Sequence, residues 1–160
     1  MPILYVVAGP NGAGKTSAFR QLVPAGTDYI NADLIAKGIR EQAGGLNTQE
    51  LANSEAAILF ENKIKAGETF AIETNLVDAD TYKSFISAQR TYGYQVTLLF
   101  LTVDDVNVCI KRVEQRVREG GHNVNPLVIR DRYVTGLKLL AHYKGENRFL
   151  SDLPFLSRTR

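Results

Sequence analysis

Short runs of apolar residues alternate along the chain with longer stretches in which apolar positions recur at helical spacing. Four runs predict buried β-strands, because they are short, contain β-branched or aromatic residues and are bounded by turn-forming residues. The last run, VTLLFLTV, is apolar almost throughout, which is typical of a strand covered on both faces. The four predicted strands cover residues 3–8, 28–32, 70–74 and 96–103.

The stretches between the strands predict helices, because residues suited to capping or ending a helix stand at their limits. The predicted helices cover residues 15–22, 33–44, 48–67, 79–92, 106–119 and 126–142. The candidate N-terminal caps are Asn47 with Glu50, Asp78, Asp104 or Asp105, and Asn125 before Pro126. The candidate terminators are Pro24, Gly67, Gly93 and the pair Gly120-Gly121.

The order strand, helix, strand, helix predicts an α/β fold with a parallel sheet and helices on both faces. The chain of 160 residues is expected to form a single domain over residues 1–160, since it contains no repeat, linker or low-complexity tract. The tail after Gly145 is compatible with either a short edge strand or loose packing.

A glycine-rich loop follows the first strand and precedes the first helix. Residues 9–16, GPNGAGKT, fit the pattern G-x-x-x-x-G-K-[ST], in which backbone N–H groups and the helix N-terminus surround a phosphate. Lys15 can reach the β- and γ-phosphates, and Thr16 offers a hydroxyl to Mg²⁺. The loop therefore predicts an ATP or GTP site made of Gly9, Pro10, Asn11, Gly12, Ala13, Gly14, Lys15, Thr16 and Ser17.

Several classes of nucleotide-binding protein do not fit the remainder of the chain. The segment NKIK lacks the final aspartate of the base-binding motif of GTPases, and EQAGGLN is not the signature of a transporter ATPase. A compact kinase-like domain remains, with ATP and Mg²⁺ as cofactors. A nucleotide-dependent ATPase or switch without a small-molecule acceptor is the alternative.

Carboxylates stand at the ends of two predicted strands, where ligands of parallel sheets bind. Asp33 follows the second strand, and Glu73 with Thr74 ends the third. Either carboxylate could accept the proton of an attacking hydroxyl group. The structural alternatives are an N-cap role for Asp33 and a buried ion pair with an arginine for Glu73.

A plain Walker B carboxylate is missing after the strongest strand, since Asp104 and Asp105 come late enough to cap the next helix. Mg²⁺ is therefore expected on Thr16, the phosphates and water, with Asp33 or Glu73 acting through a water molecule.

Arginines gather around two predicted helices joined by glycines. Arg112 and Arg116 lie four residues apart and share a helix face, and Arg130 and Arg132 begin the returning helix. This arrangement predicts a lid over about residues 110–132 whose arginines bind phosphate. A solvated face paired with Glu114 and Glu119 is the structural alternative. His122 is expected in a turn or in packing, and Cys109 in the core.

The composition and the charge distribution indicate which kinds of partner and which compartment suit the protein. The protein is 44% hydrophobic and 22% charged with one cysteine, which predicts a soluble cytoplasmic domain without disulfides, membrane spans or a signal peptide. The net charge is only +2, but residues 111–132 hold six Lys or Arg against three Asp or Glu. Since this basic segment has no aromatic residue, it favours a small polyanion over a nucleic acid.

Five segments together resemble the zeta-toxin family of P-loop kinases, closest to its short bacterial branch of zeta toxin-like proteins, also labelled predicted ABC-type ATPases. They are GPNGAGKT, NADLIA, AIETNL, RVEQRVREGGHNV and IRDRYVTGLKLL, and the resemblance covers roughly residues 3–140. It implies the P-loop kinase fold with strand order 2-3-1-4-5 and a phosphotransferase that acts on an alcohol group, in the best-known members that of the amino sugar in UDP-N-acetylglucosamine.

The resemblance also implies roles for residues of this chain. Asp33 matches the catalytic aspartate, Lys15 and Thr16 the phosphate loop, and Glu73 a substrate-side glutamate. Arg116 and Arg132, with Arg112 nearby, match the arginines of the lid. Asn75 stands where the family usually has a second threonine. The family includes toxins with antitoxin partners, but no feature of this sequence points to such a partner.

Overall fold

The structure, a computed structural model, describes residues 1–43 and 48–146. Within these residues four parallel strands form one sheet in the order β2-β3-β1-β4, which confirms the predicted fold class and matches the expected order for the first four strands. The expected fifth strand is not among the described residues, and the tail after Gly145 lies outside them apart from Glu146. The strands are β1 (Ile3–Ala8), β2 (Asp28–Ile30), β3 (Phe70–Thr74) and β4 (Gln95–Phe100).

Two strands are shorter than their apolar runs predict. β2 ends at Ile30 because Asn31 leaves the ladder and caps the next helix through its side chain. β4 ends at Phe100 because its partner β1 ends at Ala8, and Leu101 N makes one last bond of 2.8 Å to the Ala8 carbonyl. The apolar residues that follow are buried in loop conformation rather than in the ladder.

All six predicted helices are present in the described residues. They are α1 (Lys15–Leu22), α2 (Ala32–Ala43), α3 (Thr48–Ala66), α4 (Ala79–Tyr92), α5 (Val106–Arg118) and α6 (Pro126–Glu146). Asp78 caps α4, and Asp105 rather than Asp104 caps α5. The proposed cap Asn47 lies outside the described residues. None of these helices is long and apolar enough to cross a membrane.

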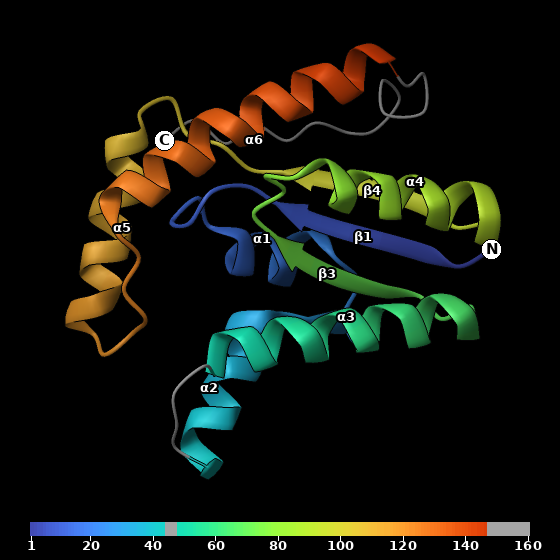
Figure 1. Cartoon of the computed structure of the whole chain (residues 1–160), viewed down its shortest axis with the longest axis horizontal. Helices are drawn as coiled ribbons and strands as arrows, with labels where there is room; N and C mark the ends of the chain where they lie inside the picture. The colour runs from blue at the N-terminus through green and yellow to red at the C-terminus, as the bar shows by residue number, and fades with distance from the viewer. Residues whose placement is uncertain (44–47, 147–160) are drawn as a thin grey trace.

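Helices cover both faces of the sheet, so the fold has three layers (Figure 1). Alternation along β1 sends Leu4 and Val6 into a cluster with α3, α4 and α6, and Val7 into a cluster with α1 and α5. Cys109 is fully buried in the second cluster, as expected. The fold is therefore the predicted P-loop kinase-like sandwich.

The carboxyl ends of the strands point toward the hairpin of α5 and α6, which contains residues 110–132, the range predicted to form a lid (Figure 1). Arg130 Nη2 donates to Asn107 Oδ1 at 2.7 Å and so ties α6 to the start of α5. The Tyr133 hydroxyl donates to the Val103 carbonyl at 2.5 Å and ties α6 to the end of the sheet. The hairpin is thus attached above the strand ends where a ligand of a parallel sheet would bind.

Candidate active site

The glycine-rich loop is built by contacts that only glycine permits. Gly9 and Gly12 have φ of 137° and 81°, a region that disfavours other residues. A Cβ on Gly9 would lie 2.2 Å from the Leu101 carbonyl oxygen, and one on Gly12 would lie 2.4 Å from that of Cys109. The glycines therefore let the loop pack directly on the end of β4 and on α5.

The loop leads into α1 at Gly14, whose φ is 96° and beside which there is open space. No side chain caps α1, so its first N–H groups are available to an anion. The turn is closed by Ala13 N, which donates to the Pro10 carbonyl at 3.1 Å. Ser17 lies exposed in the first turn of α1. This geometry is that of a phosphate-binding loop.

Lys15 is 7% exposed, and its ammonium group lies among polar groups of the loop and the sheet. Its Nζ donates to the Gly9 carbonyl at 2.7 Å, the Pro10 carbonyl at 3.2 Å and Asn75 Oδ1 at 3.1 Å. Burial lowers the pKa of Lys15, although the nearby carboxylates of Glu73 and Asp33 act in the opposite direction. Burial of Lys15 therefore disfavours its charged form at this site.

Glu73 lies at the end of β3 and is held by four groups. It accepts hydrogen bonds from the hydroxyl of Tyr29, from Asn31 Nδ2 at 2.9 Å and from Thr16 Oγ1 at 3.3 Å, and Lys15 Nζ lies 4.0 Å away. The structural alternative of an arginine partner is therefore wrong.

Tyr29 takes part in this network from β2. Its ring stacks on Phe19 at 3.8 Å between centroids, and burial together with the charge of Glu73 raises the pKa of its hydroxyl. Sequence reasoning missed Tyr29 and Asn31, since only the pairing of β2 with β3 brings them to Glu73.

Asp33 lies in the first turn of α2 and is partly exposed. The N-cap of α2 is Asn31, whose Oδ1 accepts from Asp33 N at 2.9 Å and from Leu34 N at 3.2 Å. The alternative in which Asp33 caps the helix is therefore wrong. Its carboxylate instead lines a pocket together with Lys15 and Glu73.

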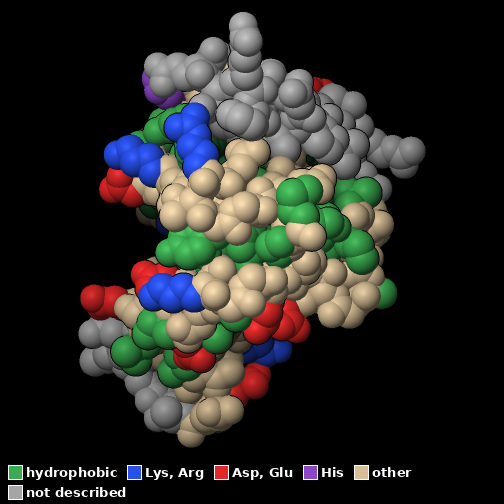
Figure 2. Space-filling view, turned by 90° about the vertical axis from the view of Figure 1, so that its right-hand side faces the viewer, with side chains coloured by type: hydrophobic (Ala, Val, Ile, Leu, Met, Phe, Trp, Pro, Cys, Tyr) green, Lys and Arg blue, Asp and Glu red, His purple; other side chains and the backbone are tan. Residues whose placement is uncertain are grey.

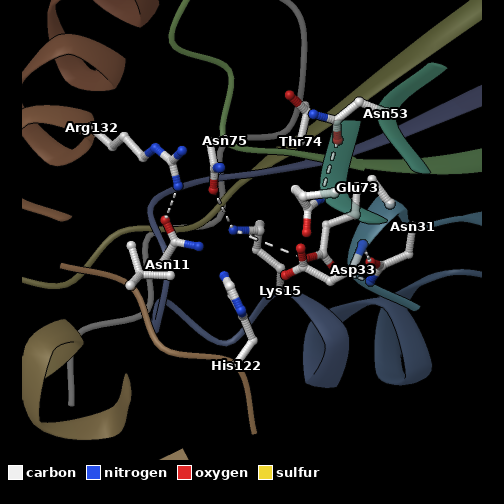
Figure 3. A pocket seen from close by; sticks show the side chains of 13 residues that line it. Asn11, Lys15, Asn31, Asp33, Asn53, Glu73, Thr74, Asn75, His122 and Arg132 are labelled. Carbon is white, nitrogen blue, oxygen red and sulfur yellow. Dashed lines mark hydrogen bonds and ion pairs between the residues drawn. The ribbon is translucent and has the colours of Figure 1, made fainter. Parts of the chain in front are cut away.

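That pocket has a volume of about 260 Å³ and lies where the loop, β3, α2 and the lid meet (Figure 3). It brings together the predicted residues Asn11, Lys15, Asp33, Glu73, Thr74 and Arg132. All of its labelled side chains are polar, and they come from segments far apart in the sequence.

The predicted arginines of the lid have different partners. Arg132 Nη1 donates to Asn11 Oδ1 at 2.8 Å, and Arg112 Nη1 donates to the Gly12 carbonyl at 3.2 Å, so both reach the loop. Arg116 Nη2 instead donates to the His122 carbonyl at 2.9 Å, and a Cβ on Gly121 would lie 2.5 Å from Arg116 Cγ.

Arg116 is thus placed at the turn of the lid, beside a neighbouring cavity that Asp33 also lines. His122 lines both cavities. Among residues 1–43 and 48–146, neither Arg112 nor Arg116 forms the ion pair with Glu114 or Glu119 that the structural alternative required.

Asn75 is a site residue that sequence reasoning noted only as a departure from the family. It is placed by Leu76, the one non-glycine residue with positive φ (53°) in the described part of the chain. Leu76 N donates to Thr74 Oγ1 at 3.0 Å, and its side chain is buried. This tight turn directs Asn75 toward Lys15, and strained turns of this kind are common at functional sites.

Comparison with known proteins agrees with this architecture. The profile of the AAA_33 family, described as an AAA domain, matches residues 4–131. The chain belongs to the AAA_33 family. The match extends from β1 into α6 and includes the loop, both carboxylates, Arg112 and Arg116, and it ends one residue before Arg132.

Individual proteins similar to this AAA_33 domain share less than 30% of its sequence. An uncharacterised protein of Haemophilus influenzae is 28% identical over 125 residues, which are 78% of this chain and 88% of that protein. A candidate kinase from Chloroflexus aurantiacus superposes with a TM-score of 0.66 at 17% identity, over 99% of this chain and 88% of that one.

A chain of the PezAT chromosomal toxin–antitoxin system of Streptococcus pneumoniae gives a TM-score of 0.66 at 19% identity, over 100% of this chain and 69% of that one. At such identities, the two solved structures establish the shared fold.

Proposed function

We propose that this AAA_33 domain is an ATP-dependent kinase that transfers the γ-phosphoryl group of ATP to a hydroxyl group of a small molecule. The observation that carries the proposal is the position of Asp33. Its carboxylate lines the same pocket as Lys15, and Asn31 rather than Asp33 serves as the helix cap. A simple nucleotide switch has no need of a free base at this point.

The glycine-rich loop and the lid supply the groups that bind ATP. Backbone N–H groups of the loop and of α1 would surround the phosphates, with Lys15 on the β- and γ-phosphates. Arg132 and Arg112 already contact the loop, so small movements would bring both guanidinium groups onto the transferred phosphoryl group. Arg116 is the third candidate phosphate-binding arginine, and it lies at the turn of the lid.

Thr16 and Glu73 fit the requirements of Mg²⁺. The hydroxyl Oγ1 and the carboxylate Oε2 lie 3.3 Å apart at the end of the loop, and both are the hard oxygen ligands that this ion prefers. No cluster of three or more metal-ligating side chains occurs among residues 1–43 and 48–146, so phosphates and water would complete the coordination. The ion would neutralise charge on the phosphates.

Asp33 is the better candidate for the base. Glu73 already accepts from Tyr29, Asn31 and Thr16, whereas the described residues give the Asp33 carboxylate no hydrogen-bond donor. In the reaction, the acceptor oxygen bonds to the γ-phosphorus while the bond to the β,γ-bridging oxygen breaks. The hydroxyl proton passes to Asp33, and ADP leaves with the electrons of the broken bond.

The resemblance to the zeta-toxin family supplies expectations about the acceptor and about a protein partner. It nominates UDP-N-acetylglucosamine as the first acceptor to test, with Glu73 and Thr74 on the substrate side, and an antitoxin-like protein as a partner to seek. We expect the protein to act in the cytoplasm.

The test is transfer of phosphate from ATP to a panel of hydroxyl compounds that includes UDP-N-acetylglucosamine, read by mass spectrometry. The proposal expects one added phosphate on an acceptor, and none with the Lys15→Ala variant. ATP hydrolysis by the wild type at a rate that no acceptor changes would contradict it and favour the ATPase alternative.

A further inference from the structure

A second and larger cavity adjoins the active-site pocket. It has a volume of about 900 Å³ and is lined by residues of α3, β3 and α4. In Figure 1, α3 and α4 lie on either side of β1 and β3. The two cavities share Asn53, Glu73, Thr74 and Asn75 in their walls. A molecule whose hydroxyl reaches Asp33 can therefore extend its remaining atoms into this groove between α3 and α4.

Both helices contribute small and large side chains to the lining of the groove. Positions 53, 57, 60 and 64 follow one another at helical spacing on α3, with Ala56 and Ala57 in the middle. Ser84 faces them from α4, and Phe60 and Phe85 meet edge to face with centroids 6.0 Å apart. Figure 2 shows that hydrophobic side chains lie across the middle of the face seen in that view.

The charges along the groove are unsuited to an anion. Its one cation among the described residues is Lys65, whose Nζ lies 3.4 Å from Glu61 Oε2. The other charged groups are the carboxylates of Glu73 and Asp78, and Asp78 accepts from the N–H and hydroxyl of Thr81.

A diphosphate placed in the groove would lose water without gaining the Arg or Lys partners that such groups need. The basic residues of the site are instead committed to the loop and the lid, where ATP would bind.

We propose that this groove binds the body of the acceptor, and that the acceptor is an alcohol with an apolar body and no anionic group. The proposal rests on the proposed kinase function and specifies its substrate class. Apolar surface of the acceptor would cover side chains such as Phe60 and Ile72, while its hydroxyl lies at Asp33 for the transfer described above.

Two compounds with the same sugar test this proposal. The p-nitrophenyl glycoside of N-acetylglucosamine carries an uncharged aromatic group where UDP-N-acetylglucosamine carries a uridine diphosphate. Binding of each compound to the full-length protein with ADP and Mg²⁺ is measured by calorimetry. We expect the aryl glycoside to bind at least about tenfold more tightly, because it brings no anionic group to a wall that carries the carboxylates of Glu61, Glu73 and Asp78.

A charge introduced into the groove gives a second measurement. Ala57→Lys places an ammonium group in the wall without a new carboxylate, and it should reduce the preference for the aryl glycoside several-fold. Ser54→Lys on the same helix is the control, because Ser54 is exposed and lies outside the lining of the groove. ADP affinity should be unchanged in both variants, which shows that they fold.

Equal or tighter binding of UDP-N-acetylglucosamine would overturn the proposal, and so would an aryl glycoside that does not bind at millimolar concentration. The first result would direct attention to the cavity beside Asp33 that Lys37 and Arg40 line. Phosphate transfer is assayed separately. Preferential binding of the aryl glycoside without transfer to any alcohol would leave the groove assignment intact and contradict the kinase function.

Discussion

The glycine-rich loop and the groove between α3 and α4 meet at Glu73, yet they are built in different ways. The loop is one continuous segment whose function rests on backbone N–H groups and on contacts that exclude a Cβ. The groove is a space between the side chains of two helices and a strand. A site made of backbone tolerates little change, whereas a site made of side chains can change its ligand and keep its fold.

The largest effect is expected from Lys15→Met on the loop side of this comparison. ATP affinity and transfer should fall by about 10³-fold or more, because the cation on the transferred phosphate is lost. Acceptor binding in the groove should be unchanged. Titration calorimetry with ATP and with the acceptor separates the two sites, and loss of both would show that they are not independent.

The same variant has a pH dependence of defined sign. Since the pKa of Lys15 is lowered below 10.5, the unfolded chain holds more protons than the folded one between the two values. Wild-type stability should therefore rise, relative to Lys15→Met, as the pH rises through the folded pKa toward 10.5. Denaturant melts at a series of pH values measure the difference in free energy of unfolding between the wild type and Lys15→Met. A difference that falls as the pH rises would contradict a lowered pKa of Lys15.

Arg132→Ala should have the next largest effect. It removes the guanidinium group that contacts Asn11 of the loop, so we expect kcat to fall by about 10²-fold with little change in acceptor affinity. Arg130→Ala is the matched control, because Arg130 contacts Asn107 of α5 instead of the loop. Steady-state kinetics decide the point, and equal losses in both variants would indicate a structural role only.

Gly12→Ala tests the backbone character of the loop. The new Cβ would lie 2.4 Å from the Cys109 carbonyl oxygen, so we expect a loss of stability of about 1–3 kcal/mol together with weaker ATP binding. Gly38→Ala, within α2 and beside open space, should instead stabilise the protein by about 0.5–1 kcal/mol. Thermal melts of both variants measure these changes. Equal shifts of the two melting temperatures would contradict the backbone character of the loop.

The smallest effect is expected from Asn75→Thr, where the two regions meet. Thr lacks the reach of the amide that accepts from Lys15 Nζ, so ATP affinity should fall by about threefold to tenfold, the value of one intramolecular hydrogen bond. Fluorescence titration with ATP measures it. An unchanged affinity would mean that Asn75 serves the acceptor side alone.

The loop was predictable from sequence because its pattern is local and its neighbours are a clear strand and helix. Its bounds as seen in the structure, between Ala8 and Lys15, are those that the pattern gives. The alternation of elements predicted a parallel sheet, whereas the order of its strands was implied by the resemblance to the zeta-toxin family. The shortened ends of β2 and β4 were not predictable, because they depend on Asn31 and on where the partner strand stops.

The groove and the support of Glu73 could not be derived from local patterns. Glu73 lies more than forty residues after Tyr29 and Asn31 in the sequence. The three side chains meet only because β2 pairs with β3. In the segment NAD, both Asn31 and Asp33 suit a helix cap, and propensity cannot choose between them. The choice depends on Asn31 also donating to Glu73, which is a tertiary contact.

The role of Asp33 is the central claim, and one paired measurement tests it most directly. Asp33→Asn is compared with the wild type for ATP affinity and for transfer of the γ-phosphoryl group, with Asp104→Asn, an exposed position outside the pocket, as control. We predict an unchanged ATP affinity, transfer reduced by about 10²- to 10⁴-fold in Asp33→Asn, and normal transfer in Asp104→Asn. Full transfer by Asp33→Asn would contradict the assignment of Asp33 as the base.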